Sequence, residues 1–184
     1  SRDREMIRFD REEAHIRMKL DRAGSSYSID MHLKKNRPKG IAINGVPIRK
    51  AGELLGLGNF VFFSPEDLNI IKSGPGERRR FVDLELCQLS KVYLFQLSNY
   101  NKILNQRNKL LKEISFRPEY LDTLDVWDSQ LVQYGQRVIQ ERELFVSRLN
   151  EIIGGIHQRL SGGRETLVIH YEKNVETGDF EQKL

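Results

Sequence analysis

Two long apolar stripes with helical spacing constrain this chain more than any other feature of its sequence. Apolar residues recur at steps of three, four or seven over residues 82–111, and again over residues 124–160. Such near-heptad spacing predicts two amphipathic α-helices. Pro118 lies between them and cannot continue a helical hydrogen-bond ladder. We therefore expect helices over residues 77–113 and 119–161, folded back on each other as an antiparallel hairpin.

The apolar side chains of these stripes should meet along the seam of the hairpin. Trp127 and the tyrosines at stripe positions should pack in the same core, instead of forming a surface on which bases stack. The predicted seam consists of Val82, Leu86, Leu89, Tyr93, Leu97, Leu131, Tyr134, Val138, Leu149 and Ile152.

The residues before the first stripe have the pattern of an antiparallel sheet. Apolar and polar residues alternate over residues 15–20 and 27–33, and turn-forming residues connect the two segments. Farther along, Asn44 and Gly45 lie between two short apolar segments. Both residues tolerate positive φ, so they predict a type I′ hairpin.

These patterns divide the chain into three regions and predict an α+β fold. Residues 1–63 should be β-rich, residues 64–163 should form a helical arm, and residues 164–184 should return to β structure. A strand is expected over residues 165–171. The predicted architecture is an antiparallel β meander with a long antiparallel helical hairpin inserted as an arm.

The junction between the first two regions, residues 60–83, carries the most specific pattern. Ser64 suits a helix N-cap, Pro65 suits the first helical position, and Asp67 completes a capping box. A Gly-Pro-Gly break follows, and three consecutive arginines then open the longer helix. A strand-like segment, a short helix, a break and a basic helix start therefore follow one another.

This order of pieces resembles a signature stretch of the RecF family of bacterial recombination mediators, which are ATP-binding-cassette proteins of the SMC/Rad50 type. The match is tight over residues 65–68 and 78–81 and departs at Ser73, where the family usually carries a glycine. Residues 100–108 resemble the family's arm near its tip, and residues 127–135 resemble the start of its returning helix. The resemblance implies that the sheet is part of an ABC-type ATPase head.

The resemblance also implies a function. The family binds gapped or duplex DNA in an ATP-dependent manner, forms a nucleotide-dependent homodimer, and works with its protein partner RecR and with RecO to load RecA. ATP and Mg²⁺ would be cofactors of the full-length protein. The alternative is a helical-hairpin adaptor that binds a protein along the arm and does not bind DNA.

No catalytic residue and no cofactor are expected within this sequence. It contains no G-x-x-x-x-G-K-[ST] phosphate loop, and in the RecF family that loop, the signature loop and the acidic ligands lie outside the matched stretch. Residues 160–163, Leu-Ser-Gly-Gly, resemble a transporter-cassette signature. A strand pattern follows them where a true signature would open a helix, so we expect Gly162 to end a helix in the left-handed conformation.

Basic residues supply the candidate DNA contacts. The formal net charge is +4, and residues 1–50 contain 13 Lys and Arg against 7 Asp and Glu. A basic balance favours polyanionic partners. Two clusters of basic residues could bind them, although each cluster could instead be an exposed, partly ion-paired surface. The candidates are Lys34, Lys35, Arg37 and Lys39, in a basic loop between strands, and Lys72, Arg78, Arg79 and Arg80, around the Gly-Pro-Gly break.

The remaining composition argues for a cytoplasmic protein without a metal. Cys87 is the sole cysteine, so a reducing compartment is expected, and its apolar neighbours suggest that it packs as a small hydrophobe. The four histidines show no paired helical spacing, so no metal site is expected. No apolar run approaches transmembrane length, and no membrane partner is expected.

Overall fold

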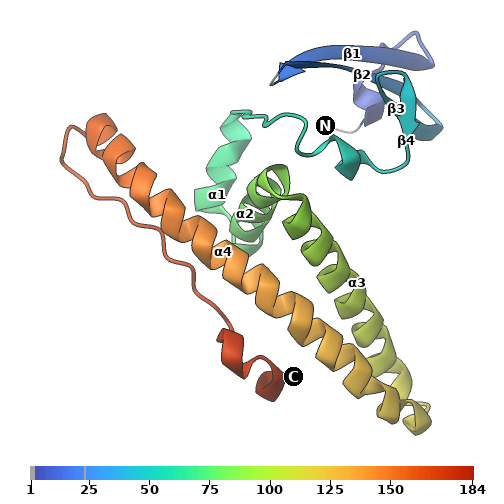
Figure 1. Ribbon diagram of the computed structural model, residues 1–184, viewed down its shortest axis with the longest axis vertical. Coiled ribbons are helices and arrows are strands. Elements are labelled where there is room, and N and C mark those ends of the chain that lie inside the picture. The colour runs from blue at the N-terminus through green and yellow to red at the C-terminus, as the bar shows by residue number, and fades with distance from the viewer. Residues whose placement is uncertain (1–2, 23) are drawn as a thin grey trace. The chain divides into compact units, whose positions relative to one another are not determined.

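Four strands in the first part of the chain form one antiparallel sheet in the order β1-β2-β3-β4 (Figure 1). The computed structural model describes residues 3–22 and 24–184. Each strand pairs antiparallel with its sequence neighbour, so the predicted meander is confirmed. The strands are β1 (Glu13–Arg22), β2 (Ser25–Lys34), β3 (Arg37–Ile43) and β4 (Val46–Ile48). The chain forms two units: Ser1–Phe62 contains the sheet, and Phe63–Leu184 contains the long helices.

A two-residue turn joins β3 to β4 and confirms the predicted type I′ hairpin. The φ angle is 50° at Asn44 and 80° at Gly45, the left-handed values that this turn requires. The Asn44 side-chain oxygen accepts a hydrogen bond from the Ser28 amide at 2.7 Å, and the Asn44 amide donates to the Ser28 carbonyl at 2.7 Å. The turn is thereby anchored to β2, the neighbour of β3.

Side-chain alternation gives the sheet one apolar face and one polar face. Ile29, Leu33 and Ile41 are buried on the apolar face. The opposite face carries charged and imidazole side chains, among them His15 and His32, which are direct cross-strand partners. Strand pairing therefore collects polar groups that lie far apart in the sequence.

The predicted basic loop over residues 34–39 is instead a tight hairpin. Lys34 is the last residue of β2 and Arg37 is the first of β3, so the turn between the strands is Lys35-Asn36. Lys39 lies within β3. Pro38 is the second residue of β3, a position near the start of a strand where proline is tolerated.

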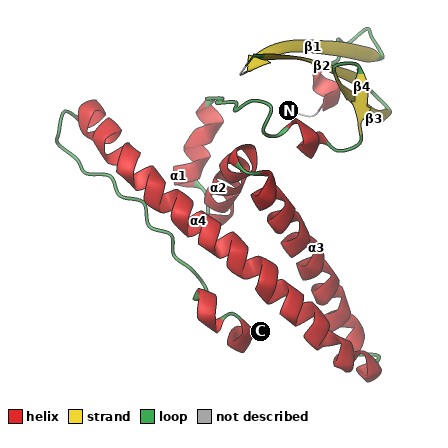
Figure 2. Ribbon diagram, viewed as in Figure 1, coloured by secondary structure: helices red, strands yellow, loops and turns green. Residues whose placement is uncertain are grey.

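The second unit is built from helices (Figure 2). α3 and α4 pack along each other as the predicted antiparallel hairpin, which closes at Pro118. The Ser64 amide donates to the Asp67 carboxylate at 2.6 Å, as the capping box requires. The elements are η3 (Pro65–Leu68), α1 (Asn69–Lys72), α2 (Pro75–Leu89), α3 (Lys91–Ile114), η4 (Pro118–Thr123) and α4 (Leu124–Ser161), where η marks a 3₁₀ segment.

The first predicted helix, residues 77–113, is broken in two at Ser90. Its backbone is extended, with φ −139° and ψ 112°, and its hydroxyl accepts a hydrogen bond from the Tyr93 amide at 3.1 Å. Ser90 is therefore an N-cap inside an apolar stripe that otherwise continues. The break changes the helical phase, and Leu89 is 62% exposed. The prediction that Leu89 lies in the seam is wrong for this reason.

Burial of the other predicted seam residues follows the length of the hairpin. Ile152 is 61% exposed and is also wrongly predicted. Arg142 of α4 already meets Tyr93 near the start of α3, so Ile152 lies about 15 Å farther along α4, beyond the first residue of α3. The buried members are Leu86, Tyr93, Leu131 and Val138, and the half-buried members are Val82, Leu97, Tyr134 and Leu149.

The core of the arm lies where the C-terminal segment meets α3 and α4. Ile103, Leu131, Ile139 and Phe180 are buried together, and Trp127 with several tyrosines packs around them. Phe180 covers Gly135 of α4: a Cβ atom on Gly135 would lie 2.7 Å from two carbons of the Phe180 ring. A side chain at position 135 would therefore displace the ring.

The strand predicted over residues 165–171 is absent, because the chain there has no strand to pair with among the described residues. The segment runs back beside α4 (Figure 1), and Asn150 takes the place of a neighbouring strand. The Asn150 side chain donates to the Ile169 carbonyl at 2.8 Å and accepts from the Ile169 amide at 2.9 Å. Both backbone groups are thus satisfied without a sheet.

The end of α4 follows the sequence prediction. Gly162 has φ 63° and Gly163 has φ 77°, and the amides of both donate to the Gln158 carbonyl. This is a left-handed glycine stop. The Leu-Ser-Gly-Gly segment therefore ends a helix and does not open one.

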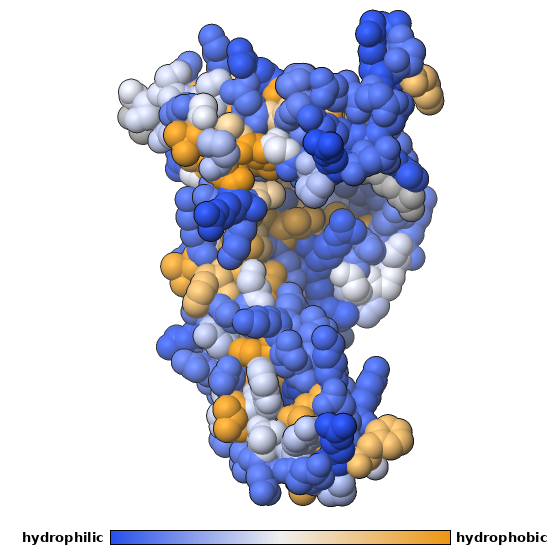
Figure 3. All heavy atoms as spheres, turned by 90° about the vertical axis from the view of Figure 1, so that its right-hand side faces the viewer, coloured by the Kyte–Doolittle hydropathy of each residue, from blue (hydrophilic) through white to orange (hydrophobic). Residues whose placement is uncertain are grey.

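The surface seen in Figure 3 is mostly hydrophilic, with separate hydrophobic patches. Residues 60–63 contribute exposed apolar side chains, including Val61 at 97% exposure. Among residues 3–22 and 24–184, no helix has both the length and the apolar character needed to cross a membrane.

Gly135→Ala should lower the free energy of unfolding of the helical unit by about 1–3 kcal/mol, because the new methyl group overpacks against Phe180. The matched control is Gly154→Ala on the same helix, where an added Cβ meets nothing within 4 Å; this change should stabilise by up to about 1 kcal/mol. Urea unfolding followed by the fluorescence of Trp127, the single tryptophan, measures both. Equal stabilisation by the two variants would contradict the packing of Phe180.

Leu131→Ala should destabilise the same unit by about 2–5 kcal/mol, since Leu131 is 2% exposed and its truncation leaves a cavity. Leu89→Ala should change stability by less than about 0.5 kcal/mol, because the side chain is already in solvent. Chemical unfolding of the two leucine variants, side by side, provides the measurement. A large cost at Leu89 would mean that the seam continues through Ser90.

Candidate nucleic-acid interface

Three exposed cations lie where α1 meets α2, and we call them the basic corner: Lys72, Arg79 and Arg80. Lys72 is the last residue of α1, and the two arginines lie in the first turns of α2. Ser73 and Gly74, both extended, connect the helices. Within the part of the chain that the structure describes, none of the three side chains forms a hydrogen bond or ion pair. They are therefore available to an external anion.

Arg78, the first of the three consecutive arginines, has an intramolecular role. Its guanidinium donates to the carbonyl of Ile70 at 3.2 Å and to that of Ser73 at 3.0 Å. These carbonyls belong to the end of α1, where helical partners are lacking. Arg78 thus fixes the angle between α1 and α2 and holds the basic corner in shape.

Two positive side chains at the start of α2 are an unfavourable local arrangement. The helix dipole places partial positive charge at this end, so cations there cost a few tenths of a kcal/mol to about 1 kcal/mol. Glu77 supplies one compensating charge in the first turn. The surplus positive potential remains at the surface, which is the electrostatic condition for binding phosphate groups.

The basic side chains of the β2–β3 hairpin, which we call the sheet hairpin, are mostly ion-paired with acidic residues of the same unit. Nζ of Lys34 lies 3.6 Å from Glu13, that of Lys35 lies 2.8 Å from Glu12, and that of Lys39 lies 3.0 Å from Asp3. Arg37 has no such partner among the described residues. The hairpin therefore presents one unpaired cation where the sequence predicted four, which makes it the weaker candidate.

A polar cluster in the arm was not predicted from the sequence. Arg142 of α4 binds Asp83 of α2 in a bidentate pair, with Nε–Oδ1 and Nη2–Oδ2 distances of 2.8 Å. The Tyr93 hydroxyl of α3 donates to Asp83 Oδ1 at 2.5 Å. The residues come from three helices and are separated by up to 59 positions, so no local pattern reveals them.

Burial shapes the protonation of this cluster. Burial, and then the hydrogen bond to Asp83, raise the pKa of Tyr93 far above its ordinary value. Burial, the largest single influence, opposes the charge on Arg142, but the hydrogen bonds and charge interactions with Asp83, Tyr93 and Tyr171 together outweigh it and leave the pKa of Arg142 raised. Arg142 therefore stays charged and the Tyr93 phenol stays neutral at physiological pH. The role of the cluster is to join the helices.

A second ion pair joins the arm near its tip. Arg107 of α3 donates from Nε to Asp128 of α4, and its Nη2 donates to the Leu184 carbonyl at 3.2 Å. The same arginine thus connects both helices of the hairpin, α3 and α4, to the C-terminal end of the chain. The hairpin is held by polar contacts at both ends and by an apolar core between them.

The polar face of the sheet brings together residues that could hold a metal ion. One ligand atom each from Glu13, His15 and His32 lies within 4.8 Å of the others. The sequence expectation of no metal site rested on helical spacing. These histidines lie on paired strands, where their register, and not their sequence spacing, brings them together.

The chain is similar over its whole length to bacterial proteins named DNA replication and repair protein RecF. Identity is 60% over 184 residues to the protein of Agathobacter rectalis and 58% over 184 residues to that of Lachnoclostridium phytofermentans. The match covers 100% of this chain and 51% of each relative. The protein of Acetivibrio thermocellus is 40% identical over 179 residues, which are 97% of this chain and 48% of that protein. No protein-family model matches the chain.

Two solved structures of the recombination mediator protein RecF in the RecFOR pathway have the same fold. The one described as RecF-ATPrS matches with a TM-score of 0.82 at 34% sequence identity, and the one described as RecF-ATP matches with 0.85 at 31%. Each match covers 100% of this chain, and 51% and 52% of the solved chains respectively. The chain therefore spans about half the length of the RecF proteins that it matches, and the resemblance predicted from the sequence is confirmed.

Arg142→Met should destabilise the helical unit by about 3–5 kcal/mol, because it leaves the Asp83 carboxylate largely buried without its countercharge. The side chains of Arg142 and Asp83 are 14% and 20% exposed. The control Arg148→Met removes an exposed arginine of α4 and should change stability by less than about 0.5 kcal/mol. Thermal unfolding by circular dichroism compares them.

The double variant Asp83→Leu with Arg142→Met should recover much of the loss, since an apolar pair can replace a buried ion pair. A double variant as unstable as Arg142→Met alone would show that the cost arises from lost packing and not from an unpaired charge.

Proposed function

We propose that this chain, which has the sequence and fold of about half of a RecF family protein, forms part of the ATPase head and the helical arm of a recombination mediator. Residues 1–63 would belong to the head, residues 64–163 to the arm, and residues 164–184 to the segment returning to the head. In this proposal the protein binds gapped or duplex DNA, works with RecR and RecO to load RecA, and acts in the cytoplasm.

The observation that carries the DNA-binding part of the proposal is the basic corner. Its three cations are exposed and unpaired in the described structure, whereas those of the sheet hairpin are mostly ion-paired. Arg79 and Arg80 lie at the positive end of the α2 dipole, which costs stability, and binding a phosphate group there would relieve this repulsion. Contacts of this type hold the DNA backbone without reading its sequence.

Nucleotide chemistry is not assigned to residues of this chain. Its sequence has no phosphate loop, and the Leu-Ser-Gly-Gly segment ends α4 at Gly162. A cassette signature would instead open a helix toward the phosphate. ATP, Mg²⁺ and the nucleotide-dependent homodimer of the proposal would therefore rely on residues of the full-length protein beyond these 184.

The second candidate is a protein-binding adaptor that does not bind DNA. It is favoured by three apolar side chains near the α2–α3 break, Leu89, Val92 and Phe95, each more than half exposed. Such side chains can bind a partner along the arm. The two candidates differ in their response to salt, because only phosphate binding releases counterions from DNA.

We would test Lys72→Ala, Arg79→Ala and Arg80→Ala in the full-length protein with ATP present. Each variant should bind gapped duplex DNA more weakly, and its loss of affinity should not depend on the DNA sequence. Each lost phosphate contact should flatten the slope of log affinity against log salt by about one unit. The matched control is Lys109→Ala, which removes the same charge from a position about 27 Å along α3 from its first residue. Fluorescence anisotropy of labelled DNA across a salt series gives both quantities.

Lys109→Ala should leave affinity and slope unchanged. If all three corner variants fold and behave like this control, the basic corner does not bind DNA and the adaptor function is the better conclusion.

A further inference from the structure

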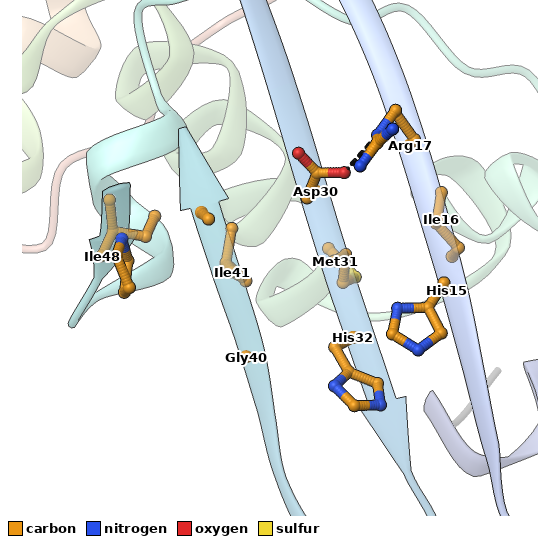
Figure 4. A pocket seen from close by; sticks show the side chains of 11 residues that line it. His15, Ile16, Arg17, Asp30, Met31, His32, Gly40, Ile41 and Ile48 are labelled. Carbon is orange, nitrogen blue, oxygen red and sulfur yellow. Dashed lines mark hydrogen bonds and ion pairs between the residues drawn. The ribbon is translucent and has the colours of Figure 1, made fainter. Parts of the chain in front are cut away.

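The polar face of the β1–β2 hairpin holds two imidazole rings against each other (Figure 4). His15 and His32 are directly opposite in the strand register, and their ring centroids are 3.9 Å apart with an interplanar angle of 22°. Glu13, two residues before His15, faces the same side, and its Oε2 lies 2.9 Å from Nε2 of His32. Three potential ligands thus converge from two adjacent strands.

We propose that Glu13, His15 and His32 form a binding site for a divalent transition-metal ion of the Zn²⁺ class. Imidazole nitrogen and carboxylate oxygen are both ordinary zinc ligands, with bonds of about 2.0–2.2 Å. In a tetrahedral site such bonds place the ligand atoms about 3.3–3.6 Å apart. The three atoms here lie within 4.8 Å of one another, so side-chain rotation alone closes the difference, and a water molecule completes the fourth position.

The backbone of the site is already in place without the ion. β1 and β2 are paired along their whole lengths, so the Cα positions of all three ligands are fixed by the ladder. Two of the ligands point to one side of β1, and the third comes from its direct partner on β2. The ion would therefore bind to a preorganised hairpin and would not have to order it.

The electrostatics of the cluster favour a cation but include one competitor. Glu13 adds an anionic oxygen ligand to the two imidazole nitrogens, and its carboxylate lies on the same side of the sheet as both rings. Nζ of Lys34 lies 3.6 Å from Oε2 of Glu13, so its positive charge competes with an ion for this carboxylate. The neighbouring Asp30 is neutralised by Arg17 and is not free to bind the ion.

There is room for an ion beside the second histidine. Gly40 of β3 is the partner of His32 in the ladder, and a Cβ atom on Gly40 would lie 3.9 Å from the Cβ of His32. The absence of a side chain at Gly40 leaves a shallow depression that includes both histidines (Figure 4). A hydrated ion can therefore reach the imidazole edges from solvent.

The ligand set selects the class of ion. Two nitrogen donors and one oxygen donor suit Zn²⁺, Co²⁺, Ni²⁺ or Cu²⁺, whereas Mg²⁺ and Ca²⁺ require oxygen ligands. Within residues 3–22 and 24–184, no other group of three His, Cys, Asp or Glu side chains has its ligand atoms this close together. The site does not involve the basic corner, so it stands independently of the proposed DNA binding.

The test uses this chain with Zn²⁺ in isothermal titration calorimetry and with Co²⁺ in visible absorption spectroscopy, both without DNA. We expect one bound ion and the intense absorption of tetrahedral Co²⁺. His15→Ala, His32→Ala and Glu13→Gln should each weaken Zn²⁺ binding by at least about tenfold. The control His170→Ala removes an exposed histidine from the other unit and should have no effect.

Lys34→Gln provides a variant with the opposite expected sign. Removing its charge should tighten Zn²⁺ binding by about thirtyfold, the factor for a unit charge about 4 Å from a divalent ion at the dielectric constant of water. Far-UV circular dichroism checks that each variant keeps the sheet. Zn²⁺ binding that is unchanged in both histidine variants, or a Co²⁺ spectrum that remains that of the hydrated ion, would overturn the proposal.

Discussion

The bidentate pair between Asp83 and Arg142, together with the Tyr93 hydroxyl, is the contact on which the helical unit depends. It joins α2, α3 and α4 through side chains contributed by all three helices. Apolar contacts tolerate sliding and rotation, but two charges that are withdrawn from water must keep their hydrogen bonds or cost several kcal/mol. The pair therefore fixes α2 against the hairpin, although the helix is interrupted at Ser90 between α2 and α3.

This contact also determines where the proposed function can reside. Asp83 holds α2 against the hairpin, and Arg79 and Arg80 in the first turns of this helix are exposed. Arg78 then binds carbonyls at the end of α1, the helix whose last residue is Lys72. One arginine of the three is used to build the corner, and the other two have no side-chain partner among the residues that the structure describes. A run of identical residues is thus divided between structure and binding.

Charge on the sheet is managed in a different way. Cross-strand pairing places Lys34 opposite Glu13 and Arg17 opposite Asp30, so most cations of the hairpin have partners within their own unit. The same pairing stacks His15 on His32, and Glu13 is the acidic residue that contacts this pair. In the sheet, therefore, register decides which polar groups compensate one another and which remain able to bind an ion.

Local features of this chain could be predicted from its sequence, because the interactions that create them span only a few residues. The Asn44-Gly45 turn, the Ser64 capping box and the Gly162 helix stop form within one turn of backbone, and the helical stripes follow from the 3.6-residue period. Together with the RecF-like signature, these features were sufficient for the α+β class and for the hairpin arm.

Tertiary structure alone decided which distant residues meet. Asp83 finds Arg142 across 59 positions, Asn150 replaces a strand for Ile169, and His15 stacks on His32. Each of these contacts depends on helix phase or strand register, and a shift of one residue would turn the side chains to another face. The break at Ser90 shows most clearly the limit of prediction from sequence. The apolar spacing continues through this residue, so the pattern does not reveal that Ser90 is the N-cap of α3, which only the separate helices α2 and α3 show. Sequence determined the turns, the caps and the helical periodicity, and packing determined where the elements break and which distant residues they meet.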